Sequence, residues 1–243
     1  MRIRWLGHAA VEIVSDSGLR IVTDPFVPGW HAPPGGALYY DPITEPYDII
    51  AVSHEHVDHN SVATVRGNPE IVRGMKLREQ GIVTVKGINF WSIGTFHDDK
   101  EGKLWGENSI LCFEVDGVKV GHSGDIGHVP TQEQLDEINK YGIDIFLLCI
   151  GLIEKEGERL EKFIIDTETK IMNGIFEALK PTIKVLIPIH YRNEKCDFRF
   201  ITVSEFCAGK PNVVYHHLSH SNFYPAYRPR QPIPEIFILK HAL

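Results

Sequence analysis

Short apolar runs separated by Gly, Ser and Asp dominate the first half of the chain. Residues 3–6 (IRWL), 10–14 (AVEIV) and 19–24 (LRIVTD) are rich in β-branched side chains and predict three strands. Residues 47–53 (YDIIAVS) form a continuous apolar run, typical of a strand that is buried on both faces. Further strands are predicted at 81–85, 87–94, 109–115 and 118–123.

The second half alternates between helical and strand patterns. Residues 130–142 predict a helix, because Thr131 and Gln134 have the spacing of a capping box and Gly142 marks the end. Residues 166–181 place apolar side chains on one helical face before a terminating proline. Strands are predicted at 144–151, 182–190, 212–217 and 235–240. This order predicts an α/β fold in which two mixed β-sheets pack face to face, with helices outside, in a single domain over residues 1–243.

Two segments carry no such pattern. Residues 24–46 are rich in Pro and Gly, and a long irregular segment within a compact domain is usually functional or mobile. Residues 154–162 are strongly charged and are interpreted as an exposed loop or a short helix.

Length and composition are those of an ordinary globular protein. The chain has 243 residues and a formal net charge of -7, which argues against a nucleic acid as its main partner. No apolar run approaches the ~18 residues of a membrane span. The cysteines form no CxxC pair and are interpreted as reduced structural thiols: Cys112, Cys149, Cys196 and Cys207. These features predict a cytoplasmic protein that acts on a small molecule, and a homo-oligomer is compatible with them.

The densest chemistry follows directly after the buried apolar run. Residues 54–59 read HEHVDH, and imidazoles and carboxylates are ligands of divalent transition metals. His54 and His56 are two positions apart after a strand, so their rings can share one ion. Asp58 and His59 follow where a helix is predicted to begin, and they can reach a second ion. With 13 histidines in 243 residues, this pattern arises by chance with a probability of roughly 0.002.

Two ions need more ligands than these four side chains. His97, Asp125 and His190 each follow a predicted strand, and strand ends are where α/β architectures place their chemistry. Each of the three, taken alone, is more simply explained as a hydrogen-bonded or turn residue. Together with the cluster they complete a set of seven candidate ligands. Glu55 and Val57 are interpreted as spacers whose side chains point away from the ions.

These motifs resemble those of the metallo-β-lactamase superfamily. The resemblance rests on H-x-H-x-D-H after an apolar strand, a later single His, a Gly-Asp pair and a last His in PIHY. It extends from WLGHAAVEI through TDPF to the final IFIL, and it is greatest to the metal-dependent hydrolases grouped with the ascorbate-6-phosphate lactonase. It implies a four-layer αββα sandwich. The chain departs from the family after residues 145–150, where relatives have a Gly pair and this chain reads GLIEKEGERLEKF, which predicts either a small lid or a surface insertion.

The resemblance also implies roles for single residues. It assigns His54, His56 and His97 to one metal, Asp58, His59 and His190 to the other, and Asp125 to both. It places His8 and Asp24 beside the site, where they are expected to orient ligands. Trp105 is expected at the edge of the site, and His122 is expected to pack rather than to bind metal. Weaker candidates for the pocket are Trp30, Tyr39, Tyr40, His31 and His128.

The expected chemistry is metal-assisted hydrolysis. Two cations lower the pKa of bound water and share a hydroxide, which attacks a carbonyl or phosphoryl centre. Asp58 is the candidate to orient this nucleophile and to take its proton. The predicted substrate is a small ester, lactone or phosphate-bearing molecule, and zinc is the expected metal, with manganese and iron as alternatives. The rival hypotheses are a phosphodiesterase or nuclease of the same fold, a di-iron oxidoreductase, and a metal-binding protein without turnover.

Overall fold

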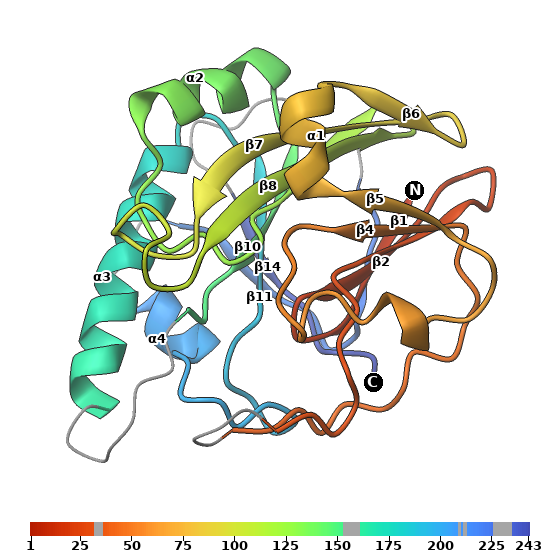
Figure 1. Cartoon of the computed structure of the whole chain (residues 1–243). Helices are drawn as coiled ribbons and strands as arrows, with labels where there is room; N and C mark the ends of the chain where they lie inside the picture. The colour runs from red at the N-terminus through yellow and green to blue at the C-terminus, as the bar shows by residue number, and fades with distance from the viewer. Residues whose placement is uncertain (32–35, 153–160, 209, 211–212, 226–234) are drawn as a thin grey trace.

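The computed structural model describes residues 1–243 except 32–35, 153–160, 209, 211–212 and 226–234. Two β-sheets pack face to face in it (Figure 1). The first sheet has the order β13-β1-β2-β3-β4-β5 and consists of β1 (Arg2–Gly7), β2 (Ala10–Val14), β3 (Arg20–Thr23), β4 (Ile49–Val52), β5 (Glu70–Arg73) and β13 (Asn222–Phe223). The second sheet has the order β12-β14-β11-β10-β9-β8-β7-β6 and consists of β6 (Val83–Val85), β7 (Ile88–Phe96), β8 (Glu107–Val115), β9 (Val118–His122), β10 (Ile145–Cys149), β11 (Val185–Ile189), β12 (Tyr215–His217) and β14 (Glu235–Ile238).

Both sheets are mixed. In the first, β1, β2 and β3 pair antiparallel, whereas β4 joins β3 and β5 in parallel. In the second, β6 to β9 form an antiparallel meander, and β9, β10, β11, β14 and β12 are parallel. The parallel strands β10 and β11 are almost wholly buried, because both of their faces are covered.

The helices are α1 (Gly74–Gln80), α2 (Gln132–Tyr141), α3 (Glu161–Leu179) and α4 (Val203–Cys207), with a short 3-10 turn η1 (Val62–Thr64). The predicted capping box of α2 is confirmed: Thr131 Oγ1 accepts from the Gln134 N–H, and the Gln134 side chain accepts from the Thr131 N–H. Gly142 ends α2 in the left-handed conformation at φ 70°. Figure 1 shows α2, α3 and α4 along the outer side of the second sheet. No helix of the described residues is long and apolar enough to cross a membrane.

Alternating side chains of the first sheet divide between two apolar clusters. Along β4, Ile49 and Ala51 join the main core, which also contains the apolar side chains of β7 to β11 and therefore lies between the sheets. Ile50 and Val52 point the other way and pack with Phe26 and residues near it. Part of the irregular 24–46 segment therefore covers the outer face of the first sheet.

The predicted α/β sandwich of two mixed sheets with helices is confirmed. Four short elements were not predicted: β5, α1, α4 and β13. The helix expected after His59 is only the 3-10 turn η1, and the helix predicted over 166–181 begins earlier, at Glu161. Of the charged segment 154–162, residues 154–160 lie outside the described residues.

Candidate metal centre

The seven candidate ligands come from both sheets and meet at one end of the sandwich. His54, His56, Asp58 and His59 lie in the turn that follows β4 of the first sheet, whereas His97, Asp125 and His190 follow β7, β9 and β11 of the second. Because β9 and β11 run parallel with β10 between them, the residues after their carboxyl ends reach the same edge. The topology thus brings together the residues that the sequence left far apart.

One group contains His54, His56 and His97. One ring nitrogen of each lies within 4.8 Å of the others, a spacing that could hold a metal ion. The ring centroids of His54 and His56 are 4.6 Å apart, and those of His56 and His97 are 4.9 Å apart. This is the set that the resemblance assigns to one metal.

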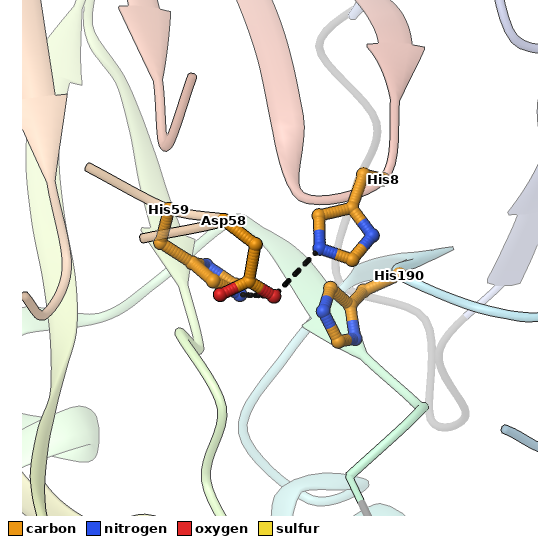
Figure 2. Close-up of side chains that lie close together, drawn as sticks. All are labelled: His8, Asp58, His59 and His190. Atoms are coloured by element: carbon orange, nitrogen blue, oxygen red, sulfur yellow. Dashed lines mark hydrogen bonds and ion pairs between the residues drawn. The ribbon is translucent and has the colours of Figure 1, made fainter. Parts of the chain in front are cut away.

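A second group contains His8, Asp58, His59 and His190, with ligand atoms within the same 4.8 Å limit. Figure 2 shows the three rings and the carboxylate turned toward one another. His8 Nε2 lies 3.1 Å from Asp58 Oδ2 and can donate a hydrogen bond to it. Asp58, His59 and His190 are the residues that the resemblance assigns to the other metal. His8 was expected beside the site, but its ring nitrogen lies within the same 4.8 Å limit as the ligand atoms of these three residues.

Asp125 lies between the two groups. Its Oδ2 atom is 3.0 Å from His97 Nε2 and 3.1 Å from His59 Nε2. The same oxygen is 3.8 Å from His190 Nε2 and 3.9 Å from His54 Nε2. A carboxylate oxygen so close to rings of both groups has the position of a ligand shared between two cations.

The position of Asp125 depends on Asn108 and Gly124. The Asp125 N–H donates to Asn108 Oδ1 at 3.1 Å, while the Asn108 amide group donates to Ser123 O. Gly124 has a φ of 51°, and a Cβ there would lie 2.2 Å from Asn108 Oδ1. Glycine is therefore required at position 124 by close packing as well as by backbone conformation.

Several buried atoms of the two groups have no hydrogen-bond partner. They include Nε2 of His54, His59 and His190 and Oδ1 of Asp125. Unpaired buried polar atoms are costly, so such a concentration of lone pairs needs an explanation. A nitrogen- and oxygen-rich set of this kind fits divalent transition metals, because a cation would use these lone pairs at once.

Asp24 and Ser53 orient two of these rings. Asp24 is fully buried, and its Oδ2 accepts a hydrogen bond from His59 Nδ1 at 2.9 Å. Ser53 donates to both oxygens of Asp24, from N–H at 2.7 Å and from Oγ at 2.5 Å. Ser53 Oγ in turn accepts from His54 Nδ1 at 2.9 Å. These bonds place one ring proton of each histidine on Nδ1 and turn Nε2 toward the cluster, where it can bind a cation when it carries no proton.

His190 is held from two directions. Its Nδ1 donates to Gly151 O at 2.8 Å, and its backbone N–H donates to His8 O at 2.9 Å. His8, Asp24 and His190 have φ values of 49°, 36° and 55°, so half of the six non-glycine residues with positive φ in the described chain belong to this site. Non-glycine residues in this region are strained, and such strain often marks functional sites.

Burial and neighbouring charges set the protonation of the cluster. Burial lowers the pKa of His54 to about 3 and also lowers the pKa of His190, so both rings are neutral at neutral pH. Burial opposes ionisation of Asp125, but His190 and His59 hold its pKa well below the usual value. Burial also opposes protonation of His59, yet Asp125 and Asp58 raise its pKa well above 6.5. A cation at His59 Nε2 would therefore displace a proton.

A pocket of about 280 Å³ opens next to both groups. Besides His56, Asp58, His97, Asp125 and His190, its lining consists of Trp30, Val57, Trp105, Leu152, Phe198 and Phe200. Trp105 lies at this pocket as expected, with its ring centroid 6.2 Å from that of His97. A site next to a concave, largely apolar pocket can receive a small molecule.

Some sequence expectations about this pocket are wrong. Val57 does not point away: it lines the pocket and is 52% exposed, while Glu55 does turn away and pairs with Arg73 at 2.6 Å. His31 and His128 do not belong to the described lining; both ring nitrogens of His128 bond to backbone atoms, Nε2 with the Phe96 N–H and Nδ1 with Val129 O.

The aromatic candidates in the 24–46 segment separate in a similar way. Trp30 lines the pocket, but Tyr40 is buried and Tyr39 is 51% exposed outside it.

His122 packs as expected, because its Nε2 bonds to Ala9 O and its Nδ1 to the Gly124 N–H, which leaves no nitrogen for a cation.

Phe198 and Phe200 were missed as pocket residues. The alternating DFRF at 197–200, shortly after PIHY, was the available signal. Leu152 was missed as well, although it stands where the resemblance predicts a second glycine.

Comparison with known proteins defines the class. The family model described as a β-lactamase superfamily domain matches residues 2–190, which is well over half of the chain. The fold agrees with this match: two mixed sheets form a sandwich, with a His/Asp cluster at one end. The chain therefore belongs to the metallo-β-lactamase superfamily.

Relatives narrow this assignment. A protein of Methanobrevibacter smithii named UPF0173 metal-dependent hydrolase is 32% identical over 219 residues, which cover 79% of this chain and 82% of that protein. One of the same name from Thermococcus onnurineus is 32% identical over 214 residues, covering 79% and 84%. A solved structure from Thermotoga maritima, proposed to be a Zn-dependent hydrolase of the superfamily, aligns with a TM-score of 0.63 at 28% identity over 98% of this chain and 97% of that one. The chain is thus a metal-dependent hydrolase of the UPF0173 family, while the narrower resemblance to the ascorbate-6-phosphate lactonase stays a prediction.

Proposed function

We propose that the protein hydrolyses a small ester, lactone or phosphate-bearing molecule with two divalent cations. One cation would be held by His54, His56 and His97, the other by Asp58, His59 and His190, and Asp125 would be shared. The observation that carries the proposal is the position of Asp125 Oδ2, within 3.0 to 3.9 Å of four imidazole nitrogens from both groups. The nitrogen-rich ligand set favours zinc over manganese and iron.

When bound, two such cations would supply a water of lowered pKa and would polarise the carbonyl or phosphoryl oxygen of the group under attack. The protein's own part is to hold the proton and the substrate. Asp58 lies at the pocket wall, and the neighbouring His59 and His8 outweigh burial and lower its pKa, so it is ionised and can accept a proton. His8 donates to Asp58 Oδ2, which fixes the carboxylate and leaves its other oxygen for a cation or a proton.

The open pocket supports turnover over simple metal storage. A structural site is closed by its own ligands, whereas here His56, Asp58 and His97 face a space of about 280 Å³.

The experiment compares metal content with hydrolysis. Protein purified without chelator is expected to hold about two metal ions per chain, to lose activity on chelation, and to regain it with zinc. Asp58→Asn is expected to lower kcat by roughly 10²–10⁴-fold. Asp99→Asn is the matched control, since Asp99 lies in an exposed ion pair with Lys100 and is not among the residues that line the pocket. Full hydrolysis by the metal-free protein would refute the proposal.

A further inference from the structure

One wall of the pocket is a row of stacked rings. Trp30 stacks on Phe198 with centroids 5.6 Å apart, and Phe198 stacks on Phe200 at 5.2 Å with only 10° between the planes. Phe200 then contacts His190 at 4.7 Å. The row thus reaches a member of the candidate metal groups, so a substrate bound there would lie against aromatic faces beside the reacting bond.

Another part of the pocket lining is also apolar, and the loop that carries it is held by hydrogen bonds to Asp98. Asp98 accepts backbone N–H bonds from Lys100 and Gly102 on one oxygen and from Leu104 and Trp105 on the other, at 2.7 to 3.0 Å. This fixed loop presents Trp105 to the pocket, although its ring is 43% exposed. The position of Trp105 at the edge of the pocket is therefore fixed by the hydrogen bonds of its own loop.

Leu152, directly after Gly151, also lines the pocket. It is buried, and its N–H donates to Glu168 Oε1 at 3.0 Å. Gly151 before it admits no side chain, because a Cβ would lie 2.3 Å from the Phe200 ring. Of these two positions, only 152 therefore contributes a side chain, and Leu152 adds an apolar surface to the pocket.

No Lys, Arg or neutral hydrogen-bonding side chain other than the two tryptophans lines the pocket among the residues that the structure describes. Its ionisable lining groups, His56, Asp58, His97, Asp125 and His190, all belong to the candidate metal site. A phosphate or carboxylate remote from the reacting bond would therefore find no cationic partner among the described lining residues, while contact with the apolar lining would cost it hydration.

We infer that the substrate is an uncharged ester or lactone whose acyl group is apolar, bound against the Trp30–Phe198–Phe200 row and the other apolar lining residues, Val57, Trp105 and Leu152. This inference rests on the proposed hydrolytic function and narrows it. It disfavours phosphorylated substrates, including the sugar-phosphate lactone that the sequence resemblance suggests.

The experiment uses methyl esters, so that the leaving group stays small and constant. The zinc-loaded protein is assayed by acid release with methyl acetate, methyl butyrate and monomethyl succinate, and with monomethyl phosphate by release of inorganic phosphate. The expected kcat/KM for methyl butyrate exceeds that for methyl acetate by about 10- to 15-fold, since each buried methylene contributes about three- to fourfold. Monomethyl succinate, which carries a carboxylate at the end of the same chain, is expected to react on the order of a hundredfold more slowly than the butyrate.

Two variants on one loop link this preference to the pocket. Trp105→Ala is expected to reduce the butyrate-to-acetate ratio about threefold, because the chain loses one apolar contact surface. Leu104→Ala is the matched control: Leu104 is 65% exposed, lies outside the described lining, and donates the same kind of backbone bond to Asp98. The butyrate-to-acetate ratio of Leu104→Ala is expected to equal that of the unmodified protein.

The outcomes separate the two proposals. Faster hydrolysis of monomethyl succinate or monomethyl phosphate than of methyl butyrate would overturn the inference and leave the hydrolytic function standing. A ratio unchanged by Trp105→Ala, or changed equally by Leu104→Ala, would also overturn it. Absence of hydrolysis of all four probes by the zinc-loaded protein would refute the proposed function itself, and the inference would fall with it.

Discussion

Asp24→Asn is expected to weaken metal binding without removing any candidate ligand. Asp24 makes three hydrogen bonds, two with Ser53 and one with His59 Nδ1. An asparagine oxygen can keep an interaction with Ser53, but the amide nitrogen then faces the His59 Nδ1–H, and two donors cannot bond to each other. His59 relieves this clash by moving its proton to Nε2, the atom that would bind the cation.

The size of the loss in metal affinity follows from the hydrogen bond from His59 Nδ1, which asparagine cannot accept through its amide nitrogen. A hydrogen bond to a charged group contributes about 1.5–3 kcal/mol. This corresponds to a loss of metal affinity of roughly 10- to 150-fold, in line with the 10–100-fold typical of residues that orient metal-bound histidines. The affinity is measured by competition with a chromophoric chelator.

The control is Asp144→Asn, the same substitution at a residue that accepts from the Lys119 N–H and pairs with Lys184 far from the cluster. Its metal affinity is expected to be unchanged, and both variants are checked by circular dichroism for intact folding. Equal affinities for Asp24→Asn and the unmodified protein would show that Asp24 does not fix the His59 tautomer, and the reasoning would fail.

Three further results are expected. His8→Asn should lower kcat about 10- to 100-fold, because asparagine is too short to hold Asp58. Stability should change little, because asparagine accepts the φ of 49° at this position. An unchanged kcat would show that His8 has no part in the mechanism. Metal binding at pH 7 should release one proton from His59, because the pKa of this residue is raised, and metal affinity should therefore fall about tenfold per pH unit on acidification. Calorimetry in buffers of different ionisation enthalpy counts the released proton. A release of zero protons would contradict the assignment of His59 as a ligand. Phe176→Ala should lower the free energy of unfolding by about 3–5 kcal/mol in urea titrations, since its ring is buried in the main core, whereas Glu177→Ala beside it should change it by less than about 0.5 kcal/mol.

The sequence predicted which histidines and aspartates lie together better than it predicted the residues around them. H-x-H-x-D-H is compact, and His97, Asp125 and His190 could be added because each follows an apolar run that predicts a strand. What brings them together is the parallel pairing of β10 with β9 and β11 and the packing of two sheets, neither of which a local pattern specifies. The resemblance to a known family supplied that step.

The pocket walls were harder to predict for the same physical reason. Tyr39 and Tyr40 looked equivalent to Trp30, yet only Trp30 lines the pocket, because alternation in an irregular segment does not reveal which side faces the site. Val57 was misjudged because the chain turns after β4, where the strict alternation of a strand no longer applies. Short elements such as α4 were missed because five residues carry too little periodicity.

The arrangement of the cluster would give bound cations a structural role beside the proposed chemical one. The first group joins His54 and His56, after β4, to His97, after β7, and the second joins His59 to His190. Each cation would therefore connect the first sheet to the second across the open end of the sandwich, where the apolar core gives way to buried imidazoles with unpaired nitrogens. A cation that binds only the folded state stabilises it in proportion to the logarithm of the metal concentration divided by Kd. Because the candidate ligands lie at one end of the sandwich, removal of the cations should loosen this end first and leave the apolar interior intact.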